Sequence, residues 1–259
     1  MSGDVHPQAI VSPRARLHDS VSVGAFSIIG DHVEIGAGTV IGPHVVINGP
    51  TIIGEHNHIY QFCSIGEAPQ DKKFADEPTR LVIGNNNTIR ECCTLNRGTS
   101  QDRGETTIGD DNWIMAYVHV AHDCVVGNHT IMANGVTLAG HVTVGDWVIF
   151  GGYSGAHQFC HVGEHAFLGM YAGVARDVPA YVMVTGQPPE PRGINLEGLK
   201  RRGFTAEQQR NLKEAYRVLY RLNLKLAEAL EELDRRLPAQ PELKPLIDSV
   251  RASERGILR

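Results

Sequence analysis

The chain has 259 residues, of which 42% are hydrophobic and only 6% aromatic, so it can bury one large core made mainly of aliphatic side chains beside a smaller unit. Its formal net charge of -5, with both signs mixed, argues against a general nucleic-acid surface. The opening residues MSGDVHPQAI lack a signal-peptide pattern and no run of 18 apolar residues occurs, so we expect a cytoplasmic protein without stable membrane insertion.

A repeat of six residues begins at once. An apolar residue returns every six positions from Val5 to Ile65, and a second uninterrupted series runs from Ile108 to Val174. Helices repeat near 3.6 residues and strands near 2, so this period fits neither an amphipathic helix nor a half-buried strand. The repeat predicts a parallel β-helix built from hexapeptides, and hence a mainly β protein.

Three hexapeptides would form one triangular coil of 18 residues, so residues 18 apart should stack at about the 4.8 Å strand spacing. Many repeat residues are followed by glycine, as in Val23-Gly24 and Ile35-Gly36, and we expect these glycines to take positive φ and turn the corners. Two positions before the repeat residue, the side chain is usually small or β-branched, which suits a narrow interior. Four of the five cysteines stand there and are expected to be buried thiols rather than disulfides or zinc ligands: Cys63, Cys93, Cys124 and Cys160.

The series is interrupted twice. The segment EAPQDKKFADEPTR, near residues 67–80, places charged residues at repeat positions, and the phase slips by one around residues 97–105. Both segments are predicted to leave the prism as loops. Polar loops on a rigid scaffold commonly carry function.

The pattern stops after Val174, and we expect a proline-rich linker up to residue 191. Thr205 and Gln208 form a capping-box pattern that predicts a helix start, with one apolar face continuing to Leu226. A last short helix is expected near residues 241–252. The predicted domains are therefore a β-helix over residues 1–189 and a helical unit over residues 190–259.

The 18-residue spacing brings polar residues of the second series together. His122, Gly140 and Gln158 should stack on one edge, with Asp123, His141 and His157 beside them and His119 outside in the same coil as His122. Imidazoles, an amide and a flexible backbone N–H within one or two strand spacings supply what acyl transfer needs, namely a base, positioning groups and an oxyanion donor.

Two chemistries can use this cluster. Neutral histidines could bind zinc, as in the trimeric carbonic anhydrases of this fold, or one histidine could act as a general base oriented by Asp123. The residues alone leave both open. A structural or ice-binding β-helix would show flat threonine arrays instead, and fits less well.

Four motifs resemble the UDP-N-acetylglucosamine O-acyltransferase family along nearly the whole chain. They are HVAHDC at 119–124, AHQFC at 156–160, PQD with Lys73 at 69–73, and NLEGLKRRGF at 195–204. The resemblance implies a homotrimer of left-handed β-helices. It also implies transfer of an (R)-3-hydroxyacyl group from acyl carrier protein to the 3-hydroxyl of UDP-N-acetylglucosamine, the first step of lipid A biosynthesis. No metal and no cofactor beyond the carrier's phosphopantetheine would be needed.

The resemblance also implies residue roles. His122 would be the general base, Asp123 would orient it, and the Gly140 N–H would stabilise the oxyanion. Met170 would fill the end of the acyl groove and select a shorter donor such as 3-hydroxydecanoyl. The implied substrate-binding residues are Gln70, Asp71, Lys73, His119, His141, His157, Gln158, Asn195, Glu197, Arg201 and Arg202.

The acidic carrier protein could contact a basic group made of Lys200, Arg201, Arg202 and Arg210, of which the first three compete with the nucleotide. Other hexapeptide-repeat enzymes remain as alternatives: an acyl- or acetyltransferase for a different acceptor, the zinc hydrase, or the related N-acyltransferase of the same pathway. The last carries an extra N-terminal domain, whereas the repeat here begins at Val5.

Overall fold

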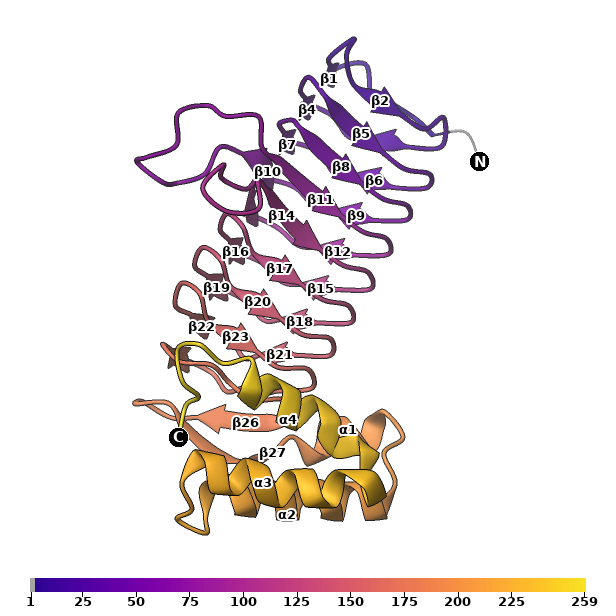
Figure 1. Cartoon of the computed structure of the whole chain (residues 1–259). Coiled ribbons are helices and arrows are strands. Elements are labelled where there is room, and N and C mark those ends of the chain that lie inside the picture. Colours follow the sequence, from indigo (N-terminus) through magenta and orange to yellow (C-terminus); the bar gives the residue numbers. More distant parts are fainter. Residues whose placement is uncertain (1–2) are drawn as a thin grey trace.

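A computed structural model describes residues 3–259 and shows an elongated triangular prism with helices at its C-terminal end (Figure 1). The prism has three faces, each a sheet of short strands from successive coils. Sheet I contains β1 (Ile10–Val11), β4 (Ile28–Ile29), β7 (Val46–Ile47), β10 (Ser64–Glu67), β13 (Thr94–Asn96), β16 (His119–Val120), β19 (Thr137–Leu138), β22 (Gly155–Ala156) and β25 (Gly173–Val174). Sheet II contains β2 (Arg16–Leu17), β5 (Val33–Ile35), β8 (Thr51–Ile53), β11 (Arg80–Ile83), β14 (Glu105–Ile108), β17 (Val125–Val126), β20 (Thr143–Val144) and β23 (His161–Val162).

Sheet III lies on the remaining face and runs to the end of the prism. It contains β3 (Ser22–Val23), β6 (Val40–Ile41), β9 (His58–Ile59), β12 (Thr88–Ile89), β15 (Trp113–Ile114), β18 (Ile131–Met132), β21 (Ile149–Phe150), β24 (Phe167–Leu168), β26 (Val182–Thr185) and β27 (Glu190–Ile194). The repeat residues point inward and are buried, as at Ile114, Leu138 and Phe150. The parallel β-helix predicted from the period is confirmed.

Residues 18 apart pair in register, as the coil length predicts. Val126 pairs with Val144, and Val144 pairs with Val162. Two coils are longer: Ile53 pairs with Ile83, 30 residues on, and Ile83 pairs with Ile108, 25 residues on. The extra residues lie between β10 and β11 and between β13 and β14, where they project from the prism (Figure 1).

The expectation that the glycines after the repeat residues turn the corners was wrong. Positive φ occurs instead at the third residue after the repeat residue. Most of these residues are not glycine, for example His44 (φ 56°) and Trp147 (φ 62°). Glycine is required for another reason. A Cβ at Gly54 would lie 2.6 Å from the carbonyl oxygen of Gly84 in the next coil, so the glycines allow the coils to approach closely.

The buried thiols are confirmed. Cys63, Cys93, Cys124 and Cys160 are buried free cysteines, whereas Cys92 is half-buried. Burial raises the pKa of the Cys124 thiol to about 12. These thiols therefore act as small packing groups inside the prism.

The segment expected to be a linker is partly ordered structure. β26 pairs in parallel with β24 and so adds a further partial coil, and β27 turns back antiparallel to β26. Alternating valines in VMVT are buried and continue the core. The period of six does not reveal them because this last coil is shorter: Leu168 pairs with Val184, 16 residues on instead of 18.

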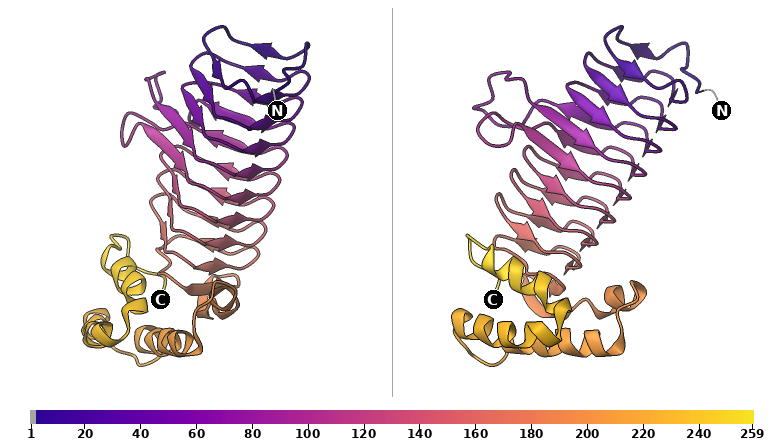
Figure 2. Two further views of the ribbon diagram at one scale, coloured as in Figure 1. Left: turned by 90° about the vertical axis from the view of Figure 1, so that its right-hand side faces the viewer. Right: turned by 45° about the vertical axis from the view of Figure 1, so that its right-hand side comes forward.

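Helices close the C-terminal end of the prism (Figure 2). They are α1 (Leu196–Arg201), α2 (Ala206–Tyr220), α3 (Leu226–Arg236) and α4 (Lys244–Arg251), with 3-10 turns η1 (Leu237–Ala239) and η2 (Pro241–Leu243). The capping box at the start of α2 is confirmed, with Thr205 and Gln208 each bonded to the other's backbone. The prediction that one apolar helix face continues to Leu226 was wrong. The chain breaks after Tyr220, Asn223 takes φ 54°, and Leu222 is 46% exposed.

The chain's C-terminal tail returns to the prism. The Leu258 N–H donates to the carbonyl of Asp177, and the Ser253 hydroxyl donates to the Asp177 carboxylate. Among residues 3–259, no helix is long and apolar enough to cross a membrane.

Candidate active site

The corner between sheets I and II carries the predicted polar cluster, and we call the turns at 121–124, 139–142 and 157–160 the His122 corner. Asp123, His141 and Phe159 occupy the positive-φ position in successive coils, with φ of 58°, 64° and 65°. This backbone conformation projects their side chains from the corner, where they stack at the coil spacing. The repeat therefore places these three groups beside one another.

His122 and Asp123 form a hydrogen-bonded pair. Nδ1 of His122 lies 2.9 Å from Oδ2 of Asp123, and both residues are buried. A carboxylate can only accept, so Nδ1 carries the proton and Nε2 is the bare nitrogen of the neutral ring. His122 thus has the tautomer that a general base requires.

The Asp123 carboxylate is held from the loop at 97–104. The Thr99 hydroxyl donates to it at 2.6 Å and the Thr99 N–H at 3.0 Å, while the Asp123 N–H donates to the hydroxyl of Thr106. Burial alone would raise the pKa of the Asp123 carboxyl, but the hydrogen bonds from His122 and Thr99 outweigh it and lower the pKa below its ordinary value. Asp123 is therefore a stable anion beside the imidazole.

Gly140 lies against the His122 ring from the next coil. A Cβ at this position would be 2.5 Å from Cε1 and 2.7 Å from Nε2 of His122, so only glycine fits. Within residues 3–259, the Gly140 N–H has no hydrogen-bond acceptor. A free N–H beside the basic nitrogen is what an oxyanion donor needs.

His141 stands beside this pair. Its ring meets the His122 ring edge to face, with centroids 4.9 Å apart, and stacks on Phe159 at 4.3 Å. Its Nδ1 lies 2.6 Å from Oδ2 of Asp102 and 3.9 Å from Oδ2 of Asp123. The sequence reasoning missed Thr99 and Asp102, because both belong to a loop outside the repeat. The phase slip was the only signal that pointed to this loop.

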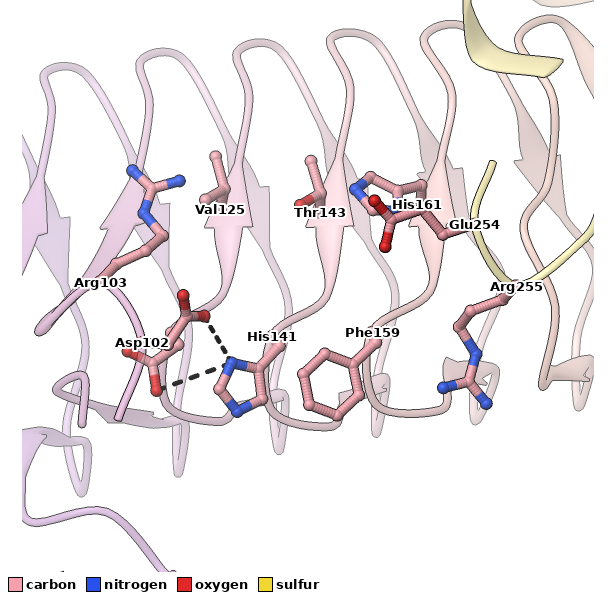
Figure 3. A pocket seen from close by; sticks show the side chains of 10 residues that line it. Asp102, Arg103, Val125, His141, Thr143, Phe159, His161, Glu254 and Arg255 are labelled. Atoms are coloured by element: carbon pink, nitrogen blue, oxygen red, sulfur yellow. Dashed lines mark hydrogen bonds and ion pairs between the residues drawn. The ribbon is translucent and has the colours of Figure 1, made fainter. Parts of the chain in front are cut away.

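A cavity of about 460 Å³ opens from the His122 corner along the face of sheet II (Figure 3). Its floor is formed by outward side chains of β17, β20 and β23, and Arg103 and Arg255 stand on opposite walls. Lining residues named in the figure are Asp102, Arg103, Val125, His141, Thr143, Phe159, His161, Glu254 and Arg255. The cavity joins the predicted cluster to both the second loop and the C-terminal tail.

The remaining predicted histidines lie around this group with different contacts. His119 is half-buried on sheet I, where its Nδ1 lies 2.7 Å from the Thr94 hydroxyl, and burial followed by the neighbouring His122 lowers its pKa. His157 and Gln158 are exposed on the following coil. Nδ1 of His157 lies 3.4 Å from the Gln158 carbonyl oxygen. Gln158 stands one coil beyond Gly140, as the spacing predicts.

The first loop is separate from this group. Gln70 and Lys73 are exposed, and the Lys73 N–H donates to the Asp71 carboxylate within the loop. Among the described residues, none of the three bonds to His122, Asp123 or His141. One protomer therefore does not bring this loop to the cluster.

A second cavity, of about 330 Å³, lies at the next corner under α1. We call the turns at 127–130, 145–148 and 163–166, covered by α1, the Arg202 corner. Its lining includes four predicted residues, Asn195, Glu197, Arg201 and Arg202, together with His129, Ile131, Trp147, Ile149, Phe167 and Gly198. The floor belongs to sheet III, so the two cavities lie on different faces of the prism.

Arg202 is the anchored cation of this cavity. Its guanidinium lies over the Trp147 ring at 5.1 Å, Nη2 donates to the Trp147 carbonyl, and Nη1 lies 3.0 Å from Nδ1 of His165. Burial, and then the charge of Arg202, lowers the pKa of His165 to about 4. His165 is therefore neutral at pH 7 and can accept the bond from Arg202.

The other three residues are held differently. Asn195 caps α1 by accepting from the Gly198 N–H and donates to the His165 carbonyl, so both ends of its amide are used. Arg201 and Glu197 are exposed and pair with each other at 3.0 Å. An exposed Arg201 beside an anchored Arg202 leaves paired guanidinium groups available to an anion.

Met170 lies at an exposed turn two residues after β24. Its side chain is 60% exposed, and a Cβ at Gly152 would be 3.6 Å from its Cε. A flexible apolar side chain here is free to contact an acyl tail.

The His122 corner also offers a donor set for a metal. Ligand atoms of His122, Asp123 and His141 lie within 4.8 Å of one another. Both imidazoles, however, direct Nδ1 to carboxylates in hydrogen bonds of 2.9 and 2.6 Å. A zinc ion bound at the two Nδ1 atoms would have to displace those bonds, whereas the Nε2 atoms could bind an ion with the carboxylates left in place.

The fold and this site define a class of protein, the hexapeptide-repeat transferases. The family model described as bacterial transferase hexapeptide (six repeats) matches residues 14–49 and 105–140. A second model, described as UDP N-acetylglucosamine O-acyltransferase, domain 2, matches residues 177–258. The first model matches two parts of the prism, and the second matches its last strands and the helical end.

Individual relatives narrow the class. The chain is 60% identical over 255 residues to the acyl-[acyl-carrier-protein]–UDP-N-acetylglucosamine O-acyltransferase of Thiobacillus denitrificans, covering 98% of this chain and 99% of that protein. It is 56% identical to the protein of the same name from Stutzerimonas stutzeri, with the same coverage. This chain belongs to the UDP-N-acetylglucosamine O-acyltransferase family.

Solved structures agree. The Francisella novicida UDP-N-acetylglucosamine acyltransferase superposes with a TM-score of 0.97 at 44% identity, covering 99% of this chain and 94% of that one. The Moraxella catarrhalis UDP-N-acetylglucosamine O-acyltransferase gives 0.96 at 47% identity, with 98% and 99% covered. The family expected from the four motifs is confirmed.

Proposed function

We propose that this enzyme transfers an (R)-3-hydroxyacyl group from acyl carrier protein to the 3-hydroxyl of UDP-N-acetylglucosamine, the first step of lipid A biosynthesis. The observation that carries the proposal is the buried His122–Asp123 pair packed against Gly140, whose N–H has no acceptor among residues 3–259. Base, orienting carboxylate and oxyanion donor stand within one coil spacing. We infer the two substrates from the family to which the chain belongs.

The reaction then follows from these groups. Nε2 of His122 takes the proton of the sugar hydroxyl while its oxygen attacks the thioester carbonyl, and the Gly140 N–H stabilises the oxyanion that forms. The tetrahedral intermediate collapses by breaking the carbon–sulfur bond. The imidazolium returns the proton to the departing thiolate, so the enzyme ends as it began. Asp123 stabilises the imidazolium between the two proton transfers.

No metal or cofactor enters these steps, and the acyl donor is carried on the phosphopantetheine of the carrier protein. A zinc-dependent enzyme is the second candidate, because the donor atoms of His122, Asp123 and His141 are close. Dialysis against a strong chelator separates the two. If the dialysed enzyme still transfers the acyl group, general base catalysis without a metal is supported. If its activity is lost and added zinc restores it, the zinc-dependent class is supported.

We also propose that the complete site is shared between subunits of a homotrimer. The two cavities lie on different faces of one prism, and among residues 3–259 no hydrogen bond joins Gln70, Asp71 or Lys73 to His122. One sugar nucleotide that uses all three regions needs a neighbouring subunit. Exposed aromatics on one edge provide an apolar surface for such contacts: Phe26, Phe62, Tyr117, Tyr153 and Tyr171. Sedimentation equilibrium of the purified chain tests the trimer.

In this arrangement Asn195, Glu197, Arg201 and Arg202 bind the nucleotide, while His119, His141, His157 and Gln158 position the sugar and acyl groups. The two guanidinium groups suit a diphosphate. Exposed cations of α1 and α2, namely Lys200 and Arg210, remain for the acidic carrier protein in the cytoplasm.

The test of the function is turnover. Wild type incubated with UDP-N-acetylglucosamine and 3-hydroxyacyl carrier protein should give the 3-O-acyl product, and His122→Ala should lower kcat/KM by about 10²–10⁴-fold. His58→Ala, on sheet III outside both cavities, is a control for loss of a stacked imidazole. Absence of product with wild type under conditions that support a known relative would refute the proposal.

Met170 tests the donor preference. We expect a shorter donor such as 3-hydroxydecanoyl to react fastest, and Met170→Gly to move the preference toward longer acyl chains, because the thioether occupies space that a longer tail needs. Competition between carrier proteins loaded with different acyl groups measures the shift. An unchanged order of preference in Met170→Gly contradicts this role.

A further inference from the structure

The second loop holds both imidazoles of the His122 corner. Thr99 fixes Asp123, and three residues later Asp102 meets His141. A backbone hydrogen bond closes the loop around these residues, because the Gly104 N–H donates to the Thr99 carbonyl at 2.9 Å. Two carboxylate–imidazole pairs therefore stand side by side, one buried and one at the cavity wall.

Asp102 decides how the His141 ring is turned. The stacking on Phe159 and the edge contact with His122 fix the plane of the ring but not which nitrogen faces the loop. Asp123 is 3.9 Å from Nδ1, too far for a hydrogen bond, whereas Asp102 is at 2.6 Å. The bond to Asp102 is thus the contact that distinguishes the two orientations.

The bond also fixes the proton. The carboxylate accepts from Nδ1–H, so the neutral His141 ring keeps Nε2 as an acceptor. Figure 3 shows the other ring nitrogen directed away from both carboxylates. An acceptor nitrogen one coil away from the basic nitrogen of His122 is placed to bind a hydroxyl group of a bound substrate.

We propose that Asp102 is a positioning residue, which holds His141 in the orientation and tautomer that bind a hydroxyl of the acceptor sugar. This inference rests on the proposed function for its substrate. It assigns to the second loop a contribution to acceptor binding that is separate from its support of Asp123.

Kinetics of single and double variants test the proposal. Asp102→Asn should raise KM for UDP-N-acetylglucosamine about tenfold with a smaller change in kcat, as expected for losing one bond between charged and polar partners. Asp102→Glu should recover part of the loss. In a His141→Ala background, Asp102→Asn should cost nothing further, because its effect passes through His141.

The exposed neighbour Gln101 provides the matched control, and Gln101→Ala should behave as wild type. Thermal unfolding of each variant checks that the prism is intact. The proposal is overturned if Asp102→Asn keeps the wild-type KM, or if its effect is additive with that of His141→Ala.

A spectroscopic readout makes the proposal independent of turnover. The ¹⁵N shifts of His141 should report a protonated Nδ1 in wild type and a mixture of tautomers in Asp102→Asn. Identical shifts in the two proteins would show that Asp102 does not set the tautomer. Failure of the wild type to form product, with the expected change in the shifts, would refute the proposed function and leave the positioning role standing.

Discussion

The His122 corner and the Arg202 corner occupy equivalent places in the repeat but have opposite environments. Both stack imidazoles and aromatic rings at the positive-φ position, through His141 and Phe159 in one and through His129, Trp147, His165 and Tyr181 in the other. At the first, buried or nearby carboxylates accept from the imidazoles. At the second, the half-buried guanidinium of Arg202 faces His165.

The difference shows that the repeat supplies positions and the elements outside it supply chemistry. A loop brings Thr99 and Asp102 to the His122 corner, and so keeps a negative charge beside a proton-accepting ring. Helix α1 and the residue after it bring Arg202 to the other corner, and so keep His165 neutral. One corner can move protons, and the other can bind an anion.

The strongest test of the His122 corner is Gly140→Ala. The added Cβ would displace the His122 ring rather than backbone, so we expect the fold to persist while kcat falls about 100-fold, because the basic nitrogen is moved out of its reactive position. Gly173→Ala is the control, because a Cβ there meets nothing within 4 Å. Steady-state kinetics and thermal unfolding measure both. Near-normal kcat in Gly140→Ala would show that the position of the His122 ring against residue 140 does not matter for catalysis.

The Arg202 corner should make the free energy of unfolding depend on pH in the acid range, through His165. Since the pKa of His165 is about 4 in the folded chain and about 6.5 when unfolded, the unfolded state binds the extra proton between these values. The stabilising contribution is complete above pH 6.5 and is lost as the pH falls toward 4, about 2 kcal/mol of it by pH 5. His165→Gln does not titrate and should lose less stability between pH 7 and pH 5.

Urea unfolding at the two pH values measures this difference. The parallel variant at the first corner, His141→Gln, serves as the comparison, because His141 lies beside carboxylates rather than a cation. Equal acid sensitivity in wild type and His165→Gln would contradict a buried neutral His165.

The smallest expected effect concerns Arg202→Lys. A lysine cannot bond the Trp147 carbonyl and His165 together while stacking on the indole, so KM for UDP-N-acetylglucosamine should rise about tenfold with little change in kcat. Arg201→Lys should have a smaller effect, since Arg201 is exposed and pairs only with Glu197. If both variants bind the nucleotide as wild type does in calorimetry, this corner is not its binding site.

Much of the fold could be predicted because the period is strict. The spacing of 18 placed Gly140 beside His122 from sequence alone, and burial of the repeat residues follows from the same count. The corners were read incorrectly, because glycine's conformational freedom suggested a turn where close approach of Gly54 to Gly84 was the cause.

The unpredicted part of the site lies off the repeat. Thr99 and Asp102 approach Asp123 and His141 from residues 24 and 39 positions earlier in the chain, by a loop whose path no period describes. Helix α1 was missed for a related reason. It has only six residues and its capping residue, Asn195, follows a strand that was read as a linker.

The second loop, residues 97–104, lies outside the strand pairing of the prism. Ile83 pairs with Ile108 across it just as Val126 pairs with Val144 without it, so no strand pairing passes through residues 97–104. Thr99 and Asp102, which hold Asp123 and His141, can therefore change without loss of the strand pairing that stabilises the prism. In such a molecule, natural variation can retune reactivity in one short segment while the scaffold stays fixed.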